Sequence, residues 1–152
     1  MGDERLDLEI RFAVPEDGRD LARYVHIDEE ILQRKIGFGE IIVASVGAEL
    51  IGFLQLEYLW SKVPYIALIH VTDGNRRRGL GKEILDFTCR ILREKGHPAI
   101  SSSSQANEPE PQNWHRRMGF EECGVIQGIN DGVDEIFFRK SLDAGTASED
   151  KE

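Results

Sequence analysis

The chain has 152 residues, of which 40% are hydrophobic, and this is enough for one domain with a buried core. No stretch approaches the ~18 to 20 apolar residues that span a bilayer, and the acidic start is unlike a secretory signal, which predicts a soluble cytoplasmic protein without a membrane partner. The formal net charge of -9 argues against nucleic acid as a partner and is compatible with a cationic substrate.

The N-terminal segment is predicted to form one strand and two helices. Residues 6–14 alternate apolar and polar side chains at period two, as a half-buried strand does. Residues 15–27 and 28–39 carry apolar side chains at three- and four-residue spacing, which predicts two short helices. Gly18 is expected to break the first helix, and Gly37 lies near the end of the second.

Three strands are predicted to follow as a meander. Residues 40–46 and 50–60 are rich in β-branched and aromatic side chains and flank a GAE turn, which predicts an antiparallel hairpin. A second turn at Ser61 and Lys62 leads into the third strand, at residues 64–72.

A long helix opens the second half of the chain. One apolar stripe runs along it from residue 80, and Gly96 terminates it. The remaining elements are a strand over residues 99–104, a helix over 110–118 and hairpin strands over 120–129 and 133–142. This order predicts a mixed α/β layer fold in a single domain of residues 1–142, followed by an acidic, disordered tail of residues 143–152.

The junction IHVTDGNRRRGLGKEI, between the third meander strand and the long helix, carries the main functional signal. Such a turn leaves backbone N–H groups unpaired at the positive end of the helix dipole, so a glycine-rich turn there suits an anion. A Walker loop is excluded because Leu80 stands where lysine is required. A dinucleotide fingerprint starting at Gly79 fails because Ile84 stands where a third glycine is needed.

From Arg76 to Gly81 the junction fits the pattern Arg/Gln-x-x-Gly-x-Gly/Ala. With the preceding IHV strand, the amphipathic helix and the MGF sequence at residues 118–120, it resembles the GNAT superfamily of acetyl-CoA-dependent N-acetyltransferases over residues 10–142. The resemblance implies a three-layer α/β fold with a largely antiparallel central sheet of about seven strands, a splayed cofactor cleft and helices on both faces. It also implies direct transfer of acetyl, or another short acyl group, from acetyl-CoA to an amine.

The resemblance also assigns the coenzyme to this junction. Backbone amides of the loop bind the pyrophosphate in the family, and the arginines add positive charge. Backbone groups of the strand before the loop contact the pantetheine arm. Asn107 stands one residue out of register with an asparagine that the family often has. The implied coenzyme-binding residues are Ile69, Val71, Arg76, Arg77, Arg78, Gly79, Leu80, Gly81, Lys82 and Asn107.

The catalytic base has several candidates. A lysine-like amine has a pKa near ~10.4, so a base must take its proton. Many family members use a glutamate on the strand before the loop, but residues 65–71 contain no carboxylate. His70 has a suitable ordinary pKa of about 6.5, and the alternative is a packed or surface strand histidine. Glu57 and Tyr65 are further candidates that an ordinary hairpin position also explains.

His115 is the candidate acid. It stands four residues before Gly119, where the family usually has a tyrosine that protonates the departing thiolate. A histidine also occurs there in the phosphinothricin-acetyltransferase-like branch, and an imidazolium can donate a proton to sulfur. The alternative is a histidine on the helix surface.

The acceptor is predicted only by class, as a small-molecule amine or the amine of a protein or peptide. His26, Asp28, Glu29 and Glu30 are candidate contacts, which a solvated helix start explains equally.

Because the strand carboxylate is missing, a non-catalytic acyl-CoA-binding or regulatory module is the alternative function. The two cysteines lack CxxC spacing, so no metal is expected. Homodimerisation is common in the family, but no residue here indicates it.

Overall fold

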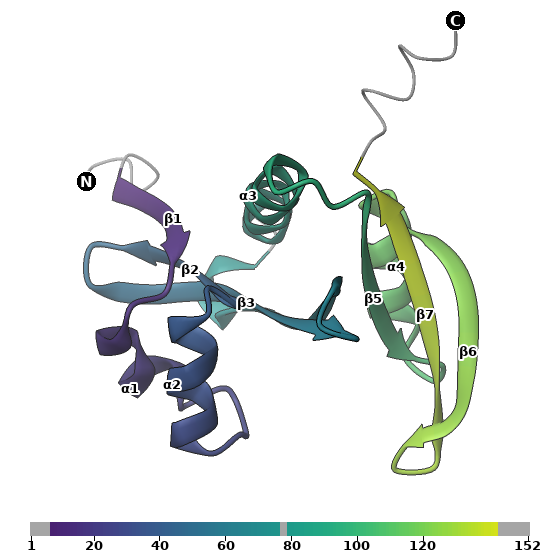
Figure 1. The fold of residues 1–152 in the computed structure, drawn as a ribbon. Helices are drawn as coiled ribbons and strands as arrows, with labels where there is room; N and C mark the ends of the chain where they lie inside the picture. The colour runs from purple at the N-terminus through teal and green to yellow at the C-terminus, as the bar shows by residue number, and fades with distance from the viewer. Residues whose placement is uncertain (1–6, 77–78, 143–152) are drawn as a thin grey trace, which may run out of the picture. The chain divides into compact units, whose positions relative to one another are not determined.

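The computed structural model describes residues 7–76 and 79–142 of a chain that divides into two compact units (Figure 1). The first unit consists of Met1–Leu56 and Leu68–Thr88, and the second of Glu57–Ala67 and Cys89–Glu152. Seven strands of the described residues are hydrogen-bonded neighbours in the order β1-β2-β3-β4-β5-β7-β6. The pairs β1–β2, β2–β3, β5–β7 and β6–β7 are antiparallel, and β4 pairs with β5 in parallel. The mixed α/β fold with a mostly antiparallel sheet is therefore confirmed.

The elements follow the predicted order. The first half contains β1 (Leu8–Phe12), the 3-10 helix η2 (Pro15–Asp17), α1 (Gly18–Leu21), α2 (Glu29–Gly37), β2 (Ile41–Val46), β3 (Glu49–Leu59) and β4 (Val63–Val71). The second half contains the 3-10 helix η3 (Asp73–Asn75), α3 (Leu80–Glu94), β5 (Ala99–Gln105), α4 (Pro109–Arg117), β6 (Glu121–Asn130) and β7 (Val133–Ser141). β3, β4 and α3 contribute residues to both units.

Two element ends differ from the expectation. α1 ends at Leu21, and the N–H groups of Arg23 and Tyr24 bond three residues back, to the carbonyls of Asp20 and Leu21. These are 3-10-type turns, so the helix does not run to residue 27. β3 stops one residue early because Trp60, with a φ of 55° and 81% of its surface exposed, stands in the turn.

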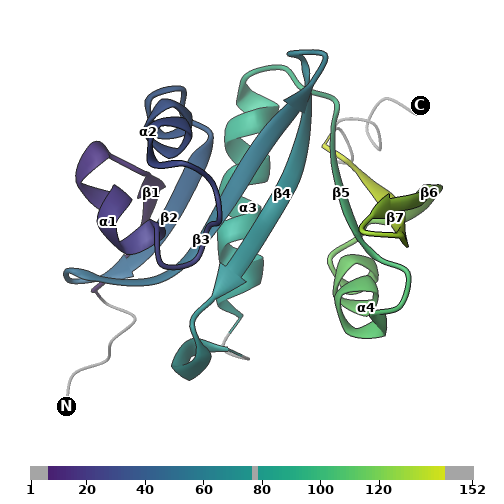
Figure 2. The same ribbon diagram turned by 90° about the horizontal axis from the view of Figure 1, so that it is seen from below.

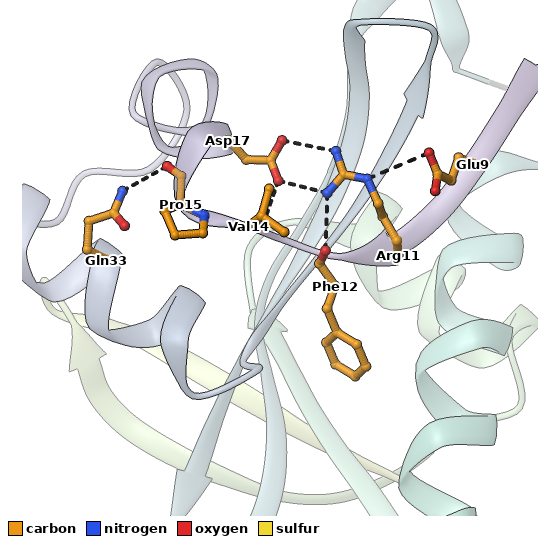
Figure 3. Close-up of polar contacts among 7 residues, drawn as sticks. All are labelled: Glu9, Arg11, Phe12, Val14, Pro15, Asp17 and Gln33. Atoms are coloured by element: carbon orange, nitrogen blue, oxygen red, sulfur yellow. Dashed lines mark hydrogen bonds and ion pairs between the residues drawn. The ribbon is translucent and has the colours of Figure 1, made fainter.

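Gly18 starts α1 and does not break a helix, contrary to the expectation. A Cβ atom on Gly18 would collide with the side-chain amide of Gln33 in α2. That amide donates a hydrogen bond to the Pro15 carbonyl oxygen at 3.2 Å (Figure 3). A larger residue at this position would therefore displace the flexible end of the Gln33 side chain.

In the first unit, α1 and α2 cover one face of β2 and β3, and the first turns of α3 cover the other (Figures 1 and 2). On the α3 side, a Cβ on Gly52 would lie 3.0 Å from both Ile84 Cδ1 and the His70 carbonyl oxygen. Burying one Leu or Ile side chain contributes about 1.5 to 3 kcal/mol. The core on the α1 and α2 side consists of Ala13, Leu21, Val25, Leu32, Ile36, Ile41, Val43 and Phe53.

Arg11 of β1 holds the segment that leads into these helices (Figure 3). Its guanidinium donates to both carboxylate oxygens of Asp17, at 2.8 and 3.1 Å, and to the Phe12 carbonyl at 3.1 Å. The Val14 N–H donates to Asp17 Oδ2 at 2.7 Å. The hydrogen bond from Arg11 is the main cause that holds the Asp17 pKa below its ordinary value, and the Val14 N–H adds to it. One carboxylate therefore closes the turn between β1 and α1.

The substitution Asp17→Asn is expected to lower the free energy of unfolding by about 1 to 2 kcal/mol at pH 7, because it removes the charge from a bidentate pair. Since the folded-state pKa of Asp17 is lowered, its contribution is complete above the unfolded-state pKa and is lost as pH falls through the folded-state pKa. Urea denaturation between pH 7 and pH 3 measures this difference. Glu16→Gln, at an exposed neighbour, is the control, and an equal loss in both variants would contradict the prediction.

In the second unit, β5, β7 and β6 form a twisted ribbon with α4 against one face (Figures 1 and 2). The β6–β7 turn has Asp131 and Gly132 at φ values of 52° and 89°, as the Asn-Asp-Gly sequence predicts. Ser102 of β5 and Phe138 of β7 are paired and buried, and both contact α4 through His115. α4 is therefore fixed to the ribbon through His115.

Some expectations concern the chain as a whole. In residues 7–76 and 79–142, no helix is long and apolar enough to cross a membrane. In the same part of the chain, no group of three or more histidine, cysteine, aspartate or glutamate side chains could hold a metal ion. A single domain over residues 1–142 stays a prediction, and the predicted tail at 143–152 lies outside the described residues.

Candidate active site

Thr72 anchors the junction between β4 and α3 to β3. Its backbone N–H donates to the Ile51 carbonyl at 3.0 Å, and its hydroxyl donates to the same oxygen at 3.3 Å. The Asn75 N–H closes η3 on the Thr72 carbonyl at 2.9 Å, and the Asn75 side-chain amide donates to Thr72 Oγ1 at 2.9 Å. The turn is thus built from its own polar groups, and it determines where α3 begins.

Gly79 lies immediately before α3 with a φ of 78°, a conformation that side chains with a Cβ rarely adopt. Its carbonyl accepts the Glu83 N–H at 3.1 Å, so the helix ladder starts there. The N–H groups of Leu80, Gly81 and Lys82 precede that first bond and have no intrahelical acceptor. The side chain of Leu80 is buried, which fixes the first turn to the core. The geometry gives a row of donors at the positive helix end, suited to an anion.

Two basic side chains near this helix start are described. Arg76 Nε donates to the Val71 carbonyl at 3.2 Å, and its guanidinium lies 3.4 Å from Asp73. Lys82 donates to Asp86 at 2.9 Å, and this hydrogen bond is the main cause that raises the Lys82 pKa. Both cations are exposed. The other two predicted arginines, at positions 77 and 78, lie outside the described residues.

His70 lies on β4 in the same unit as the junction. Its ring is 4.7 Å from the ring of Tyr24 and 5.6 Å from that of Phe53. Burial is the main cause that lowers the His70 pKa, and the nearby charge of Arg76 adds to it, while Asp73 opposes it. The imidazole is therefore mostly neutral at pH 7 and can accept a proton.

His115 lies on α4 in the second unit and is buried, with 4% of its surface exposed. Nδ1 is 2.9 Å from the Pro111 carbonyl oxygen, and Nε2 is 2.7 Å from Ser102 Oγ. The ring stacks on Phe138 at 4.6 Å with a 9° interplanar angle, and Phe120 meets it edge-on. The expected alternative, a histidine on the helix surface, is therefore wrong.

The hydrogen bonds of His115 assign its tautomer. A carbonyl oxygen only accepts, so Nδ1 carries the proton for Pro111, and Nε2 accepts from the Ser102 hydroxyl when the ring is neutral. Burial is the main cause that lowers the His115 pKa to about 4, and the charge of Arg116 contributes. An imidazolium would have to form against that burial, so the proton-donor role stays a prediction.

The predicted site residues fall into both units. Ile69, His70, Val71, Arg76 and the start of α3 belong to the first, whereas His115 and Asn107 belong to the second. Asn107 is exposed in the turn between β5 and α4.

The sequence does not predict the contacts of Ser102 and Ser103, because a run of four serines carries no periodicity that separates its two faces. Ser102 contacts His115, whereas Ser103 donates to Glu135 on the other face. Ser104 Oγ is buried and has no hydrogen-bond partner among the described residues. Glu135 lies on β7, far from the serines in the sequence, so no local pattern indicates these contacts.

A strand, an anchored glycine turn and a helix start thus stand in the order that the sequence predicts. A sequence profile of the Acetyltransferase (GNAT) family matches residues 7–120, which is most of the chain. The chain belongs to the GNAT family. In this GNAT chain the matched region contains the glycine turn, both candidate catalytic histidines and Asn107.

Three relatives illustrate how far the similarity extends. Streptothricin acetyltransferase of Streptomyces lavendulae is 30% identical over 93 residues, which are 59% of this GNAT chain and 49% of that protein. A Bacillus anthracis structure, proposed to be a streptothricin acetyltransferase and bound to acetyl coenzyme A, is 25% identical with a TM-score of 0.60, over 66% of this chain and 61% of that one. The ribosomal-protein-alanine N-acetyltransferase of Brucella melitensis shares the fold, with a TM-score of 0.74 at 19% identity over 88% and 99% of the two chains. The chain spans about half the length of the curated relative.

Proposed function

We propose that this chain transfers an acetyl group, or another short acyl group, from its coenzyme A thioester to an amine. The observation that carries the proposal is the left-handed Gly79 at the start of α3, directly after β4, in a chain of the GNAT family. Acetyl-CoA is proposed as the donor, in keeping with the Bacillus anthracis relative that was solved with it.

The helix start offers the groups that a pyrophosphate needs. Backbone N–H groups from Leu80 to Lys82 would bind the phosphate oxygens, and Arg76 would add positive charge. Arg77 and Arg78 are proposed to add positive charge in the same way. Backbone groups of Ile69 and Val71, together with Asn107, would contact the rest of the coenzyme. When bound, the thioester supplies an activated acyl carbon and a thiolate leaving group.

The acceptor is proposed as a primary amine of a small molecule or of a protein or peptide. The relatives include enzymes named for an antibiotic and for a ribosomal-protein alanine, and these names cover both classes. The net charge of -9 favours a cationic acceptor. A cytoplasmic location and homodimerisation stay predictions, which cell fractionation and sedimentation would check.

His70 is the proposed base that takes a proton from the acceptor nitrogen as the amide forms. Its ring is mostly neutral at pH 7 because burial and Arg76 lower its pKa. Contacts with Tyr24 and Phe53 hold the ring in place. A neutral imidazole in a fixed orientation is what general-base catalysis requires.

The substitution His70→Gln is expected to lower kcat by about 100-fold, because positioned proton transfer contributes about 10²- to 10⁴-fold. Activity that depends on neutral His70 falls as pH drops through its lowered pKa, so the variant should lose that acidic limb of the pH–rate profile. Steady-state kinetics across pH, with acetyl-CoA affinity measured separately, provide the test. His97→Gln, at a partly exposed histidine of the second unit, is the control. An unchanged profile in His70→Gln would remove His70 from the mechanism.

The function itself is tested by thiol release from acetyl-CoA in the presence of an amine panel. The panel contains alkylamines, amino acids, streptothricin and peptides with a free N-terminal alanine. Release that depends on one class of acceptor identifies that class. Tight acetyl-CoA binding without acceptor-dependent release would favour the non-catalytic acyl-CoA-binding or regulatory module, and absence of acetyl-CoA binding would reject both functions.

A further inference from the structure

Three rings of the first unit, those of Tyr24, Phe53 and His70, form one cluster. Tyr24 belongs to the segment between α1 and α2, and its ring centroid lies 4.7 Å from that of His70 at an interplanar angle of 35°. The ring of Phe53, on β3, lies 5.6 Å from His70 and 6.0 Å from Tyr24. These centroid distances are typical of favourable aromatic contacts. Each ring therefore contacts the other two, and all three residues belong to one unit.

The two neighbours of His70 differ in their surroundings. Phe53 is fully buried and belongs to the core of the first unit, so it supports many contacts besides His70. Tyr24 is half-buried and packs against the same core. Its backbone N–H donates to the Leu21 carbonyl at 2.9 Å, and the Val25 N–H donates to the same oxygen at 3.1 Å. Since Leu21 and Val25 are buried, Tyr24 is held in place although it lies outside a helix.

The ring nitrogens of His70 remain available for a bound molecule. Within the described residues neither nitrogen has a hydrogen-bond partner, and neither is fully buried. In a Ser-His-Asp triad a carboxylate orients the histidine and stabilises its protonated form. Among the described residues no carboxylate bonds to His70, and ring contacts surround it instead. Its orientation therefore depends on Tyr24 and Phe53.

Opposing effects act on a positive charge at the His70 ring. Burial is the main cause that lowers the His70 pKa, the charge of Arg76 adds to it, and the charge of Asp73 opposes it. The face of an aromatic ring is negative and attracts a cation within about 6 Å of its centroid. Two rings side by side could not approach to 4.7 Å, so the His70 ring lies over the face of Tyr24. Tyr24 therefore offsets part of the cost of an imidazolium here without a hydrogen bond.

We propose that Tyr24 is a positioning residue, which holds the His70 imidazole and stabilises the imidazolium that forms when His70 takes the acceptor proton. The inference rests on the proposed acetyl transfer and on His70 as its base. The N–H bond of the acceptor breaks, its electron pair stays on the amide nitrogen, and its proton binds a ring nitrogen of His70. The imidazolium later releases this proton to water. Because His70 becomes positive only as the proton moves, the contact with Tyr24 favours the transition state over the ground state.

Two variants separate the aromatic face of Tyr24 from its bulk. The Tyr24 hydroxyl has no hydrogen-bond partner among the described residues, so Tyr24→Phe should keep the wild-type kcat. Tyr24→Leu keeps an apolar side chain but removes the negative ring face, and it should lower kcat about 3- to 10-fold. The acidic limb of its pH–rate profile should also move to lower pH, while the dissociation constant of acetyl-CoA stays unchanged. Steady-state kinetics across pH and calorimetry measure these quantities.

Tyr58→Leu is the matched control. Tyr58 is a half-buried tyrosine like Tyr24, and its ring contacts a different histidine, His97 of the second unit, at 5.9 Å. The control should leave kcat and the pH–rate profile unchanged. An equal loss in Tyr24→Leu and Tyr58→Leu would overturn the inference, as would a wild-type kcat in Tyr24→Leu.

A double-mutant cycle tests whether Tyr24 acts through His70. In the His70→Gln background, Tyr24→Leu should lower kcat no further, because the base that Tyr24 supports is already absent. The same loss in both backgrounds would indicate a general structural role of Tyr24 and contradict the inference. A loss in Tyr24→Phe as large as that in Tyr24→Leu would do the same, since phenylalanine keeps the ring face.

A second measurement does not depend on turnover. NMR titration of the ring protons gives the His70 pKa, and the spectrum of His70→Gln identifies these signals among the four histidines. The His70 pKa should be lower by about 0.5 in Tyr24→Leu than in Tyr24→Phe, because the imidazolium loses the ring face. Equal values in the two variants overturn the inference whether or not an acceptor is found. If wild-type protein acetylates no amine while the His70 pKa responds as expected, the failure belongs to the proposed acetyl transfer and not to the contact between the two rings.

Discussion

Replacing Gly79 with aspartate is expected to raise the dissociation constant of acetyl-CoA by about 100-fold or more, which corresponds to about 2.7 kcal/mol. Gly79 has a φ of 78°, so any Cβ there strains the turn that places the first N–H groups of α3. The aspartate carboxylate would also occupy the positive helix end and repel a pyrophosphate from it. Strain and charge act in the same direction, which makes this the largest expected effect on binding. Isothermal titration calorimetry measures it directly.

Two further variants separate the causes. Gly47→Asp makes the same change in the β2–β3 turn, where the glycine has a φ of 60° and an added Cβ would meet no heavy atom within 4 Å, and it should leave acetyl-CoA affinity unchanged. Gly79→Ala introduces strain without charge and should cost about tenfold, or about 1.4 kcal/mol. Wild-type affinity in Gly79→Asp, with its circular dichroism spectrum unchanged, would place the coenzyme somewhere other than this helix start.

The elements that the sequence predicts well are those defined by local patterns. α3 ends at Glu94, two residues before Gly96, whose φ of 92° reflects the left-handed turn that glycine favours. Likewise, the β6–β7 hairpin turns at Asp131 and Gly132, which accept positive φ values. The glycine turn before α3 belongs to the same class, because its spacing and its neighbours in sequence are sufficient to predict it. In each case the decisive residues lie within a few positions of one another.

The features that the sequence does not predict depend on contacts between distant residues. Ser103 forms hydrogen bonds with Tyr65, 38 positions before it, and with Glu135, 32 positions after it. Nothing near Ser103 in the sequence indicates these partners. His115 lies among polar and basic neighbours, which is typical of a helix surface, yet α4 is short and packs this ring on Phe138 of a later strand. Burial of a polar side chain is a tertiary property, so periodicity alone could not assign it.

His115→Ala is expected to lower the free energy of unfolding by about 3 kcal/mol or more at pH 7.5, the largest stability effect of any single change considered. The substitution removes a buried ring that stacks on Phe138 and leaves the Ser102 hydroxyl and the Pro111 carbonyl without their partner. Urea denaturation measures the loss. His26→Gln, at an exposed histidine, is the control and should be neutral.

The burial of neutral His115 also predicts how stability depends on pH. Its pKa falls to about 4 in the folded chain, whereas it returns to about 6.5 on unfolding. The unfolded state therefore binds the proton first as pH falls, so the stabilisation is complete above about pH 6.5 and is lost between about pH 6.5 and 4. The loss should be on the order of 3 kcal/mol. In His115→Gln this part of the pH dependence should disappear, and its persistence would assign it to other groups.

The variant His115→Gln also tests the predicted catalytic role of His115. If the neutral ring only holds α4 on the ribbon, His115→Gln lowers stability, while the pH dependence of kcat in the surviving folded protein stays that of the wild type. If His115 protonates the departing thiolate, the variant loses the limb of the kcat profile that reports its ionisation, and a donor with a less basic thiol leaving group recovers the rate. Turnover measured well below the midpoint of urea unfolding separates the two outcomes. With Nδ1 bound to Pro111 and Nε2 to Ser102, we expect the first.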